Sequence, residues 1–223
     1  MPAPYLFHVN LRPPGGVDEK AWEKALVEEY LADLVQTKSA TRFSLYRESY
    51  NFPLAAKQRA PRQHLLYIQT NHPELLLVGD HSKLLPAINS STASEVLDVR
   101  NYNLIQSFDP KNHGEEPSQT LLTAELHPVD EDDLHSWYKE EHLGMLSEIP
   151  GYCRSSRYEI GPRTDYTFGE KLPKFIANHY FTSLDGFATP IGEAVSLTPW
   201  SQKVITTSPI FVLRGWDLVV AGS

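Results

Sequence analysis

The chain repeats itself, and this internal repeat constrains the fold more than any other sequence feature. Residues 17–46 (VDEKAWEKALVEEYLADLVQTKSATRFSLY) align without a gap to residues 129–158 (VDEDDLHSWYKEEHLGMLSEIPGYCRSSRY). Ten of the thirty aligned positions are identical, whereas average composition gives roughly one identity in sixteen positions by chance. A duplicated unit of about 110 residues explains this similarity.

Both copies show the same order of predicted elements. Each begins with a short strand, over 5–13 or 120–128, that ends at a proline. A helix follows, with Asp18 or Asp130 as its expected N-cap and acidic residues in its first turn. Strands are then expected over 41–49 and 152–160 and over 63–70 and 175–183. A shorter helix and a last strand, over 99–108 or 208–216, complete each copy.

This order, βαββαβ twice, is typical of the ferredoxin-like unit. Both helices of such a unit cover one sheet face, so the other face must be buried against a second sheet. We therefore predict an α+β fold in which two tandem ferredoxin-like βαββαβ repeats form an intramolecular α+β barrel. The expected domains are a diverged N-terminal repeat (1–108), a polar linker (109–118) and a C-terminal repeat (119–223).

Composition narrows the class of protein. The 223 residues are 41% hydrophobic and 22% charged, with a net charge of -8, which argues against binding to nucleic acid. The single cysteine, Cys153, excludes an intramolecular disulfide and fits a reducing compartment. We find no signal-peptide pattern and no apolar run long enough to span a membrane, so we expect a cytoplasmic protein. The tandem repeat can complete its own barrel as a monomer, although exposed sheet edges would also allow a homodimer.

The helix after Asp130 carries one apolar side when residues are placed 100° apart: Leu134, Tyr138, Met145 and Ile149. Glu141 falls inside this apolar side, His142 falls on its shoulder, and Leu143 falls on the opposite, solvent side. A buried carboxylate is costly unless it is paired, hydrogen-bonded or protonated. Glu141 is therefore the anomaly of this helix.

Two interpretations of Glu141 stay open. It could form an ion pair with Arg154 on the next strand, and the same two residue types recur in the first copy as Glu29 and Arg42. That recurrence favours a structural tie between helix and strand in both repeats. Alternatively, Glu141 orients the imidazole of His142 or acts as a second acid or base.

Trp137, Tyr138 and His142 differ from Glu141 because they do not recur. The first copy has alanine, leucine and tyrosine at the corresponding positions. Residues with a structural role are expected in both copies of a duplication, whereas catalytic residues are often retained in only one copy. We therefore interpret His142 as a candidate general base or acid rather than as a core-edge histidine bonded to backbone.

The strands of the second copy add further candidates. Alternation over 175–182 places His179 on one face, and Asn178 and Tyr180 on the other. His179 is either a second acid or base, or a satisfied buried histidine. Tyr152, Arg154, Ser156 and Tyr158 are expected to share one face of their strand, where they would hold a phenolate or carboxylate, or contact a helix. No histidine spacing typical of a metal site occurs, so no metal or other cofactor is predicted.

The motif W-Y-x-x-E-H followed by P-G resembles the EthD-like family of the dimeric α+β barrel superfamily. The residues that carry it are Trp137, Tyr138, Glu141, His142 and the pair Pro150–Gly151. The resemblance covers the second half of the chain, about 119–218, and the first half fits by architecture. It implies a pocket beside the sheet and relatives that are cofactor-free lyases, isomerases, cyclases, decarboxylases and small monooxygenases, in fungi commonly of secondary metabolism. The same superfold also includes haem proteins.

The resulting hypothesis is a cofactor-independent enzyme that performs acid–base chemistry on a small aromatic, polyketide-like or terpenoid molecule. Cyclisation, dehydration, decarboxylation and isomerisation all fit such a lyase or isomerase. The candidate catalytic residues are His142, Tyr138, Glu141 and His179, and the candidate substrate-binding residues are Trp137, Arg154, Tyr158, Asn178 and Tyr180. Two alternatives remain: a non-catalytic small-molecule-binding or stress-type barrel protein, and a haem or oxygen-using member of the superfold.

Overall fold

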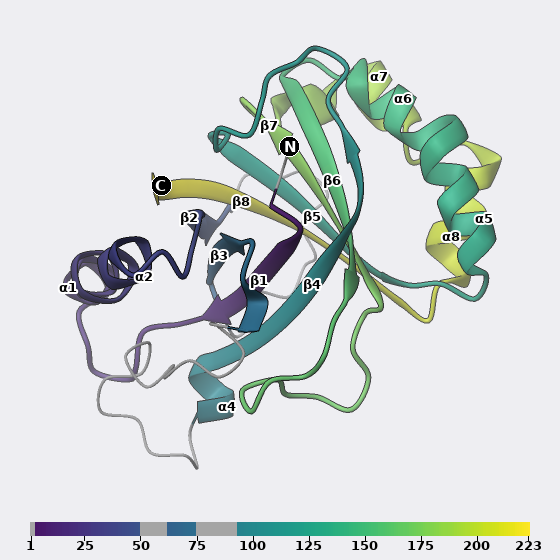
Figure 1. Cartoon of the computed structure of the whole chain (residues 1–223). Helices are drawn as coiled ribbons and strands as arrows, with labels where there is room; N and C mark the ends of the chain where they lie inside the picture. Colours follow the sequence, from purple (N-terminus) through teal and green to yellow (C-terminus); the bar gives the residue numbers. More distant parts are fainter. Residues whose placement is uncertain (1–2, 50–61, 75–92) are drawn as a thin grey trace.

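Eight antiparallel strands close into a barrel with helices packed on its outside (Figure 1). The structure is a computed structural model that describes residues 3–49, 62–74 and 93–223. The strands are β1 (Tyr5–Leu11), β2 (Arg42–Glu48), β3 (His64–Thr70), β4 (Leu97–Phe108), β5 (Thr120–His127), β6 (Tyr152–Ile160), β7 (Phe175–Phe181) and β8 (Ile210–Gly222). The predicted α+β fold of two tandem ferredoxin-like repeats in an intramolecular barrel is confirmed.

The barrel order is β1-β3-β2-β8-β5-β7-β6-β4. The first repeat supplies the sheet β4-β1-β3-β2 and the second supplies the equivalent sheet β8-β5-β7-β6. Two antiparallel joins between repeats, β2 with β8 and β4 with β6, close the barrel. Each described strand is therefore paired on both sides, and the barrel leaves no free sheet edge among them for a second chain to extend.

The helices follow the expected positions. The first repeat contains α1 (Glu19–Ala25), the π-helical segment η1 (Leu26–Leu31), α2 (Ala32–Gln36) and α4 (Ala93–Val96). The second contains α5 (Glu131–Trp137), the π-helical segment η3 (Tyr138–His142), α6 (Leu143–Ser147), the 3-10 turn η4 (Asp185–Ala188), α7 (Pro190–Ala194) and α8 (Pro199–Thr207). Asp18 and Asp130 cap their helices as predicted, each accepting a backbone N–H. Most of the second helix expected in the first copy lies outside the described residues.

The π-helical segments change which residues face the sheet. Hydrogen bonds from i to i+5 widen the turn, so each residue of η3 rotates the helix by less than the 100° assumed for an α-helix. The residues that follow are consequently rotated around the helix axis by a smaller angle than predicted, so they face a different direction. Leu143, expected on the solvent side, is buried at 2% exposure, and Glu141 is turned out of the apolar side to a half-buried position. The segment η1 occupies the equivalent place in the first repeat.

Three apolar clusters follow from strand alternation. One lies between the first sheet and α1–α2, and a second lies between the second sheet and α5–α8. The third fills the barrel between the two sheets and is rich in aromatic residues, including Tyr46, Tyr67, Tyr102, Tyr158 and Trp216. The two outward faces and the shared interior are thus separate environments.

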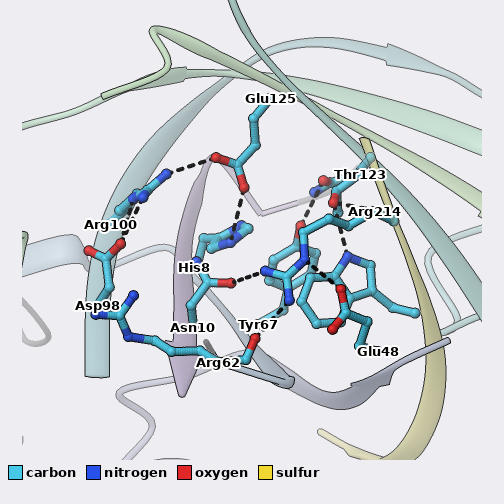
Figure 2. Close-up of polar contacts among 12 residues, drawn as sticks. His8, Asn10, Glu48, Arg62, Tyr67, Asp98, Arg100, Thr123, Glu125 and Arg214 are labelled. Carbon is cyan, nitrogen blue, oxygen red and sulfur yellow. Dashed lines mark hydrogen bonds and ion pairs between the residues drawn. The ribbon is translucent and has the colours of Figure 1, made fainter. Parts of the chain in front are cut away.

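One end of the barrel interior holds a network of buried charges (Figure 2). Arg100 donates to Asp98 (2.7 Å) and to Glu125 (2.8 Å), and Arg214 donates to Glu48 (3.2 Å) and to the Asn10 amide oxygen (3.2 Å). The carboxylates of this network therefore have guanidinium partners. The network is a structural element of the barrel rather than an open site.

His8 lies within this network, 4.0 Å from Glu125. Burial, reinforced by the Arg100 charge, holds the pKa of His8 well below its ordinary value. The imidazole is therefore neutral near pH 7, and its contact with Glu125 is not an ion pair at that pH.

Candidate functional site

A cavity of about 460 Å³ opens between the second sheet and the helices that cover it. Its walls come from β5, β7 and β8 on one side and from α5–α8 on the other. The lining residues are mostly apolar or aromatic: Leu122, Ala124, Trp137, Tyr138, His142, Leu146, His179, Phe187, Gly192, Val195, Ser196, Gln202, Ile205, Phe211, Val212 and Leu213. A hollow with an apolar wall and a few polar groups is typical of a small-molecule site.

The outer wall of the cavity is formed by two short helices, α7 and α8, each of which begins with an N-cap residue and a proline. Thr189 caps α7 and Thr198 caps α8, and each is followed by a proline at the first helical position. Gly192 permits α7 to lie directly against η4, because a Cβ there would meet the Gly186 carbonyl oxygen at 2.4 Å. This close contact shapes the cavity roof.

His142 faces the cavity and stacks on Trp137, with ring centroids 3.9 Å apart at 25°. The Trp137 Nε1 donates to Ser201 Oγ at 3.2 Å, which fixes the indole against α8. Burial lowers the pKa of His142 well below its ordinary value, and the neighbouring His179 and Arg157 lower it further. His142 is therefore a neutral imidazole near pH 7.

His179 projects from β7 into the same cavity, on the opposite sheet face from Asn178 and Tyr180, which is the alternation predicted. Its ring centroid lies 6.1 Å from that of His142, and its Nδ1 is 2.7 Å from Ser155 Oγ. Its Nε2 is buried and has no hydrogen-bond partner among the described residues. Burial, with a contribution from Arg157, lowers the pKa of His179 to about 3. The cavity thus contains two neutral imidazoles, and each has one buried ring nitrogen, Nδ1 of His142 and Nε2 of His179, without a hydrogen-bond partner among the described residues.

Arg157 gives this region its charge. The side chain is 3% exposed, its guanidinium lies 3.8 Å above the Tyr138 ring, and it donates to Gln106 Oε1 at 2.7 Å. Across the described parts of the chain it forms no ion pair with a carboxylate. Burial lowers the pKa of Arg157 to about 10, which still leaves it protonated near neutral pH. An uncompensated cation behind Tyr138 favours negative charge in the cavity.

Four predicted substrate-binding residues lie on the other face of the sheet, inside the barrel. Arg154 stacks on the Tyr180 ring at 3.6 Å and bonds to the backbone of Glu115. Asn178 accepts a hydrogen bond from Tyr67 at 2.7 Å, and Tyr158 is fully buried in the interior cluster. The structure brings together His142, His179, Tyr138 and Trp137, but not these four.

A β-bulge changes the expected faces of β6. Its pairing with β7 shifts between Tyr152 and Arg154. Tyr152 therefore packs with the helix-side cluster, together with Ser155, instead of sharing a face with Arg154 and Tyr158. Strict alternation had placed Tyr152 on the barrel side, and that prediction is wrong because the bulge adds one residue.

Glu141 has a different partner from the expected one. Its carboxylate accepts a hydrogen bond from Thr198 Oγ1 at 2.6 Å, and Thr198 in turn caps α8. The expected ion pair with Arg154 is not formed, because the π-helical turn moves Glu141 outward and Arg154 points into the barrel. In the first repeat Arg42 pairs with Glu116 of the linker. Glu141 does not line the cavity and acts on it only through α8.

Sequence reasoning missed Arg157, Ser155 and the cavity wall formed by residues 187–205. A comparison of the two repeats would have identified Arg157 and Ser155 as candidate site residues. Arg157 corresponds to Leu45 and Ser155 to Phe43, so both are polar in the second copy and apolar in the first. The same criterion that selected His142 would have selected them.

One group of side chains in the first repeat has the composition of a metal site. Glu19, Glu23 and His64 bring one ligand atom each to within 4.8 Å of one another. Arg47 already forms ion pairs with both carboxylates, at 3.3 Å and 2.5 Å. A guanidinium in this position opposes binding of a divalent cation, so the group is a charge-paired tie between α1 and the sheet.

The fold and this site together define an α+β barrel protein with an apolar cavity in its second repeat. No family model matches the sequence, so the resemblance to the EthD-like family is not confirmed. No curated protein matches it either. Among the described residues, no helix has the length and apolar character needed to cross a membrane.

Solved structures of the same fold do match. An anthrone oxidase-like protein is 12% identical, with 100% of this chain and 94% of that chain covered and a TM-score of 0.57. A candidate monooxygenase from Lactobacillus acidophilus is 9% identical, with 99% and 96% covered and a TM-score of 0.54. A candidate chlorite dismutase is 14% identical, with 97% and 95% covered and a TM-score of 0.57. The likeness at these identities concerns the fold.

The names of these proteins correct our functional hypothesis. They refer to an oxidase, a monooxygenase and a dismutase, and none refers to cyclisation, dehydration, decarboxylation or isomerisation. The lyase or isomerase hypothesis is therefore contradicted. The findings favour the alternative of a haem or oxygen-using member of the superfold.

The cavity residues do not fit haem well. His142 and His179 offer nitrogen ligands for iron, but the lining contains no lysine or arginine that would pair with the two haem propionates. A neutral aromatic molecule suits this wall better.

We expect titration of the protein with hemin to produce no shifted Soret band in the absorbance spectrum, because the cavity lacks a cation for the propionates. The same titration of the His142→Ala variant is the control. A stoichiometric Soret shift in the wild type that His142→Ala abolishes would show that the cavity does hold haem.

Proposed function

We propose that the protein is an oxygen-using enzyme that oxidises a small, neutral aromatic molecule in the cavity of its second repeat. The observation that carries this proposal is the pair of neutral imidazoles, His142 and His179, facing one apolar cavity. The names of structures with the same fold, which refer to an oxidase and a monooxygenase, support the direction of the chemistry.

The substrate class follows from the cavity and its charge. An apolar wall binds a neutral aromatic molecule, and the positive field of Arg157, which lies behind Tyr138 and not on the wall, favours an anion formed from it. A molecule with an acidic C–H group conjugated through an aromatic ring to a ketone meets both conditions, since its deprotonation gives a delocalised carbanion. Such an electron-rich anion can transfer electrons to molecular oxygen without another reductant.

The proposed reaction turns a methylene group of the substrate into a carbonyl group, consumes one molecule of oxygen and releases one molecule of water. The substrate supplies all four electrons. A base first removes one C–H proton, and the carbanion combines with oxygen through a one-electron transfer and radical recombination. The resulting peroxide anion takes back that proton to become a hydroperoxide. Removal of the second C–H proton then breaks the O–O bond, and the leaving hydroxide takes up that proton to form water.

The two histidines match the two proton removals. His179 lines the cavity, and its buried Nε2 has no hydrogen-bond partner among the described residues, so we assign it as the first base. His142, at 6.1 Å between ring centroids, is placed to remove the second proton. Because burial and Arg157 oppose a charged imidazolium at His179, proton uptake becomes favourable only beside the substrate anion.

We expect the protein to consume oxygen when it is given anthrone, a three-ring ketone with a reactive methylene group. The expected stoichiometry is one O2 per substrate, and one labelled oxygen in the product when 18O2 is used. An oxygen electrode and mass spectrometry measure both, against the rate without protein. Val195→Phe, which fills the cavity, should abolish the uptake. Val219→Phe, at an exposed side chain of β8, should not change it. Uptake at the background rate across a panel of such ketones would refute the proposal.

A further inference from the structure

A chain of buried hydroxyl groups leads from the cavity histidine to a backbone carbonyl. His179 Nδ1 lies 2.7 Å from Ser155 Oγ, Ser155 Oγ lies 2.8 Å from the Tyr152 hydroxyl, and that hydroxyl lies 3.4 Å from the Phe108 carbonyl oxygen. His179 and Ser155 are each 1% exposed and Tyr152 is 3% exposed. Of these residues, only His179 lines the cavity; the other three lie behind its wall.

The three hydrogen bonds share one donor-to-acceptor direction, because the Phe108 carbonyl oxygen at the far end can only accept a hydrogen bond. The Phe108 carbonyl takes the single hydroxyl hydrogen of Tyr152, so Tyr152 must accept the hydrogen of Ser155. Ser155 then accepts from His179, which places the ring hydrogen on Nδ1. All three hydrogen bonds are satisfied in this direction.

The opposite direction is less favourable on two counts. If Tyr152 donated to Ser155 and Ser155 donated to His179, the contact with Phe108 would lose its hydrogen. The ring hydrogen would also move to Nε2 of His179, where the described residues provide no acceptor. A buried N–H without an acceptor is rarer and costlier than an unused lone pair.

We infer that Tyr152 and Ser155 are positioning residues that hold His179 in the tautomer with its hydrogen on Nδ1 and leave the lone pair of Nε2 free. The tautomer does not depend on the proposed function. Only the role of Nε2 as the base that removes the substrate proton rests on that proposal. The bulge in β6 makes the arrangement possible, because it brings Tyr152 and Ser155 to the same face. The corresponding residues of the first repeat, Ala40 and Phe43, cannot form such a chain.

Nitrogen NMR of the wild-type protein tests the tautomer without any substrate. Long-range 1H–15N correlation of protein labelled on histidine, at pH 7, should show for His179 a protonated Nδ1 and an unprotonated Nε2. The His179→Gln spectrum identifies the resonances. A hydrogen on Nε2 overturns the inference, whatever the protein does with oxygen. Conversely, the expected tautomer in a protein that consumes no oxygen would leave the inference standing while the proposed function fails.

Tyr152→Phe tests the direction of the chain. Without the tyrosine hydroxyl, the Ser155 hydrogen has His179 Nδ1 as its remaining partner, so the ring hydrogen should move to Nε2. Oxygen uptake should then fall about 10- to 100-fold, the range found for groups that orient a functional histidine. Tyr46→Phe, in the barrel interior, lies outside this hydrogen-bond chain and should leave both the tautomer and the rate unchanged. A Tyr152→Phe protein with the wild-type tautomer would contradict the proposed direction.

Discussion

Replacing His179 with glutamine should lower kcat/KM for oxygen-dependent turnover by about 100-fold or more, because the positioned base is lost. Glutamine keeps a polar side chain of similar reach but cannot take a proton from carbon. Initial oxygen uptake at several substrate concentrations measures the change. His113→Gln, at an exposed histidine in the linker, is the matched control and should keep the wild-type rate.

The pH dependence of kcat/KM in the wild type gives a second test of whether His179 acts as the base. A base must be neutral to act, so activity falls only as the pH drops through its pKa. Since burial lowers the pKa of His179 to about 3, kcat/KM should stay level between pH 8 and pH 5. A rate that halves near pH 6.5 would point to a solvated histidine as the base. A His179→Gln rate within threefold of wild type would exclude His179 from that role.

Replacing Glu125 with alanine should lower the free energy of unfolding by about 1.5–3 kcal/mol, because it removes a charge-assisted hydrogen bond and leaves Arg100 with Asp98 as its anionic partner. Glu125 is 7% exposed, so water cannot replace its carboxylate in the folded barrel. Urea unfolding followed by tryptophan fluorescence measures the loss.

Two further variants separate this charge effect from a simple truncation. Glu131→Ala removes an exposed carboxylate paired with Lys174 and should change stability by less than about 1 kcal/mol. Glu125→Gln keeps a hydrogen-bond acceptor for Arg100 without the negative charge and should destabilise the protein less than Glu125→Ala. If Glu125→Ala is as mild as Glu131→Ala, the network does not stabilise the barrel as we describe.

The barrel architecture was predictable because its signals are local and are repeated. Apolar alternation marks each strand, Asp18 and Asp130 mark the helix starts, and the duplication shows that the elements occur twice. Packing rules then require the two uncovered sheet faces to meet. Each of these steps depends on residues close together in the sequence or on a repeat that can be read directly.

The candidate site was predictable only in part. Repeat divergence selected Trp137, Tyr138 and His142, and alternation placed His179 on the opposite sheet face from Asn178 and Tyr180. Neither method could tell which of these faces would be hollow. The cavity exists because α7 and α8 cover the second sheet at a distance set by contacts such as Trp137–Ser201 and Glu141–Thr198, which join residues 64 and 57 positions apart in the sequence.

The sequence by itself determined the duplicated βαββαβ order, the closed barrel and the concentration of aromatic and imidazole groups in the second repeat. The tertiary structure decided which of those groups meet. Two irregularities, the π-helical turn at 138–142 and the bulge between Tyr152 and Arg154, each change the phase of a regular pattern. The first turns Glu141 away from the cavity, and the second places Tyr152 beside Ser155. Pattern analysis assumes a constant period, whereas these shifts depend on hydrogen bonding and packing with partners distant in the chain.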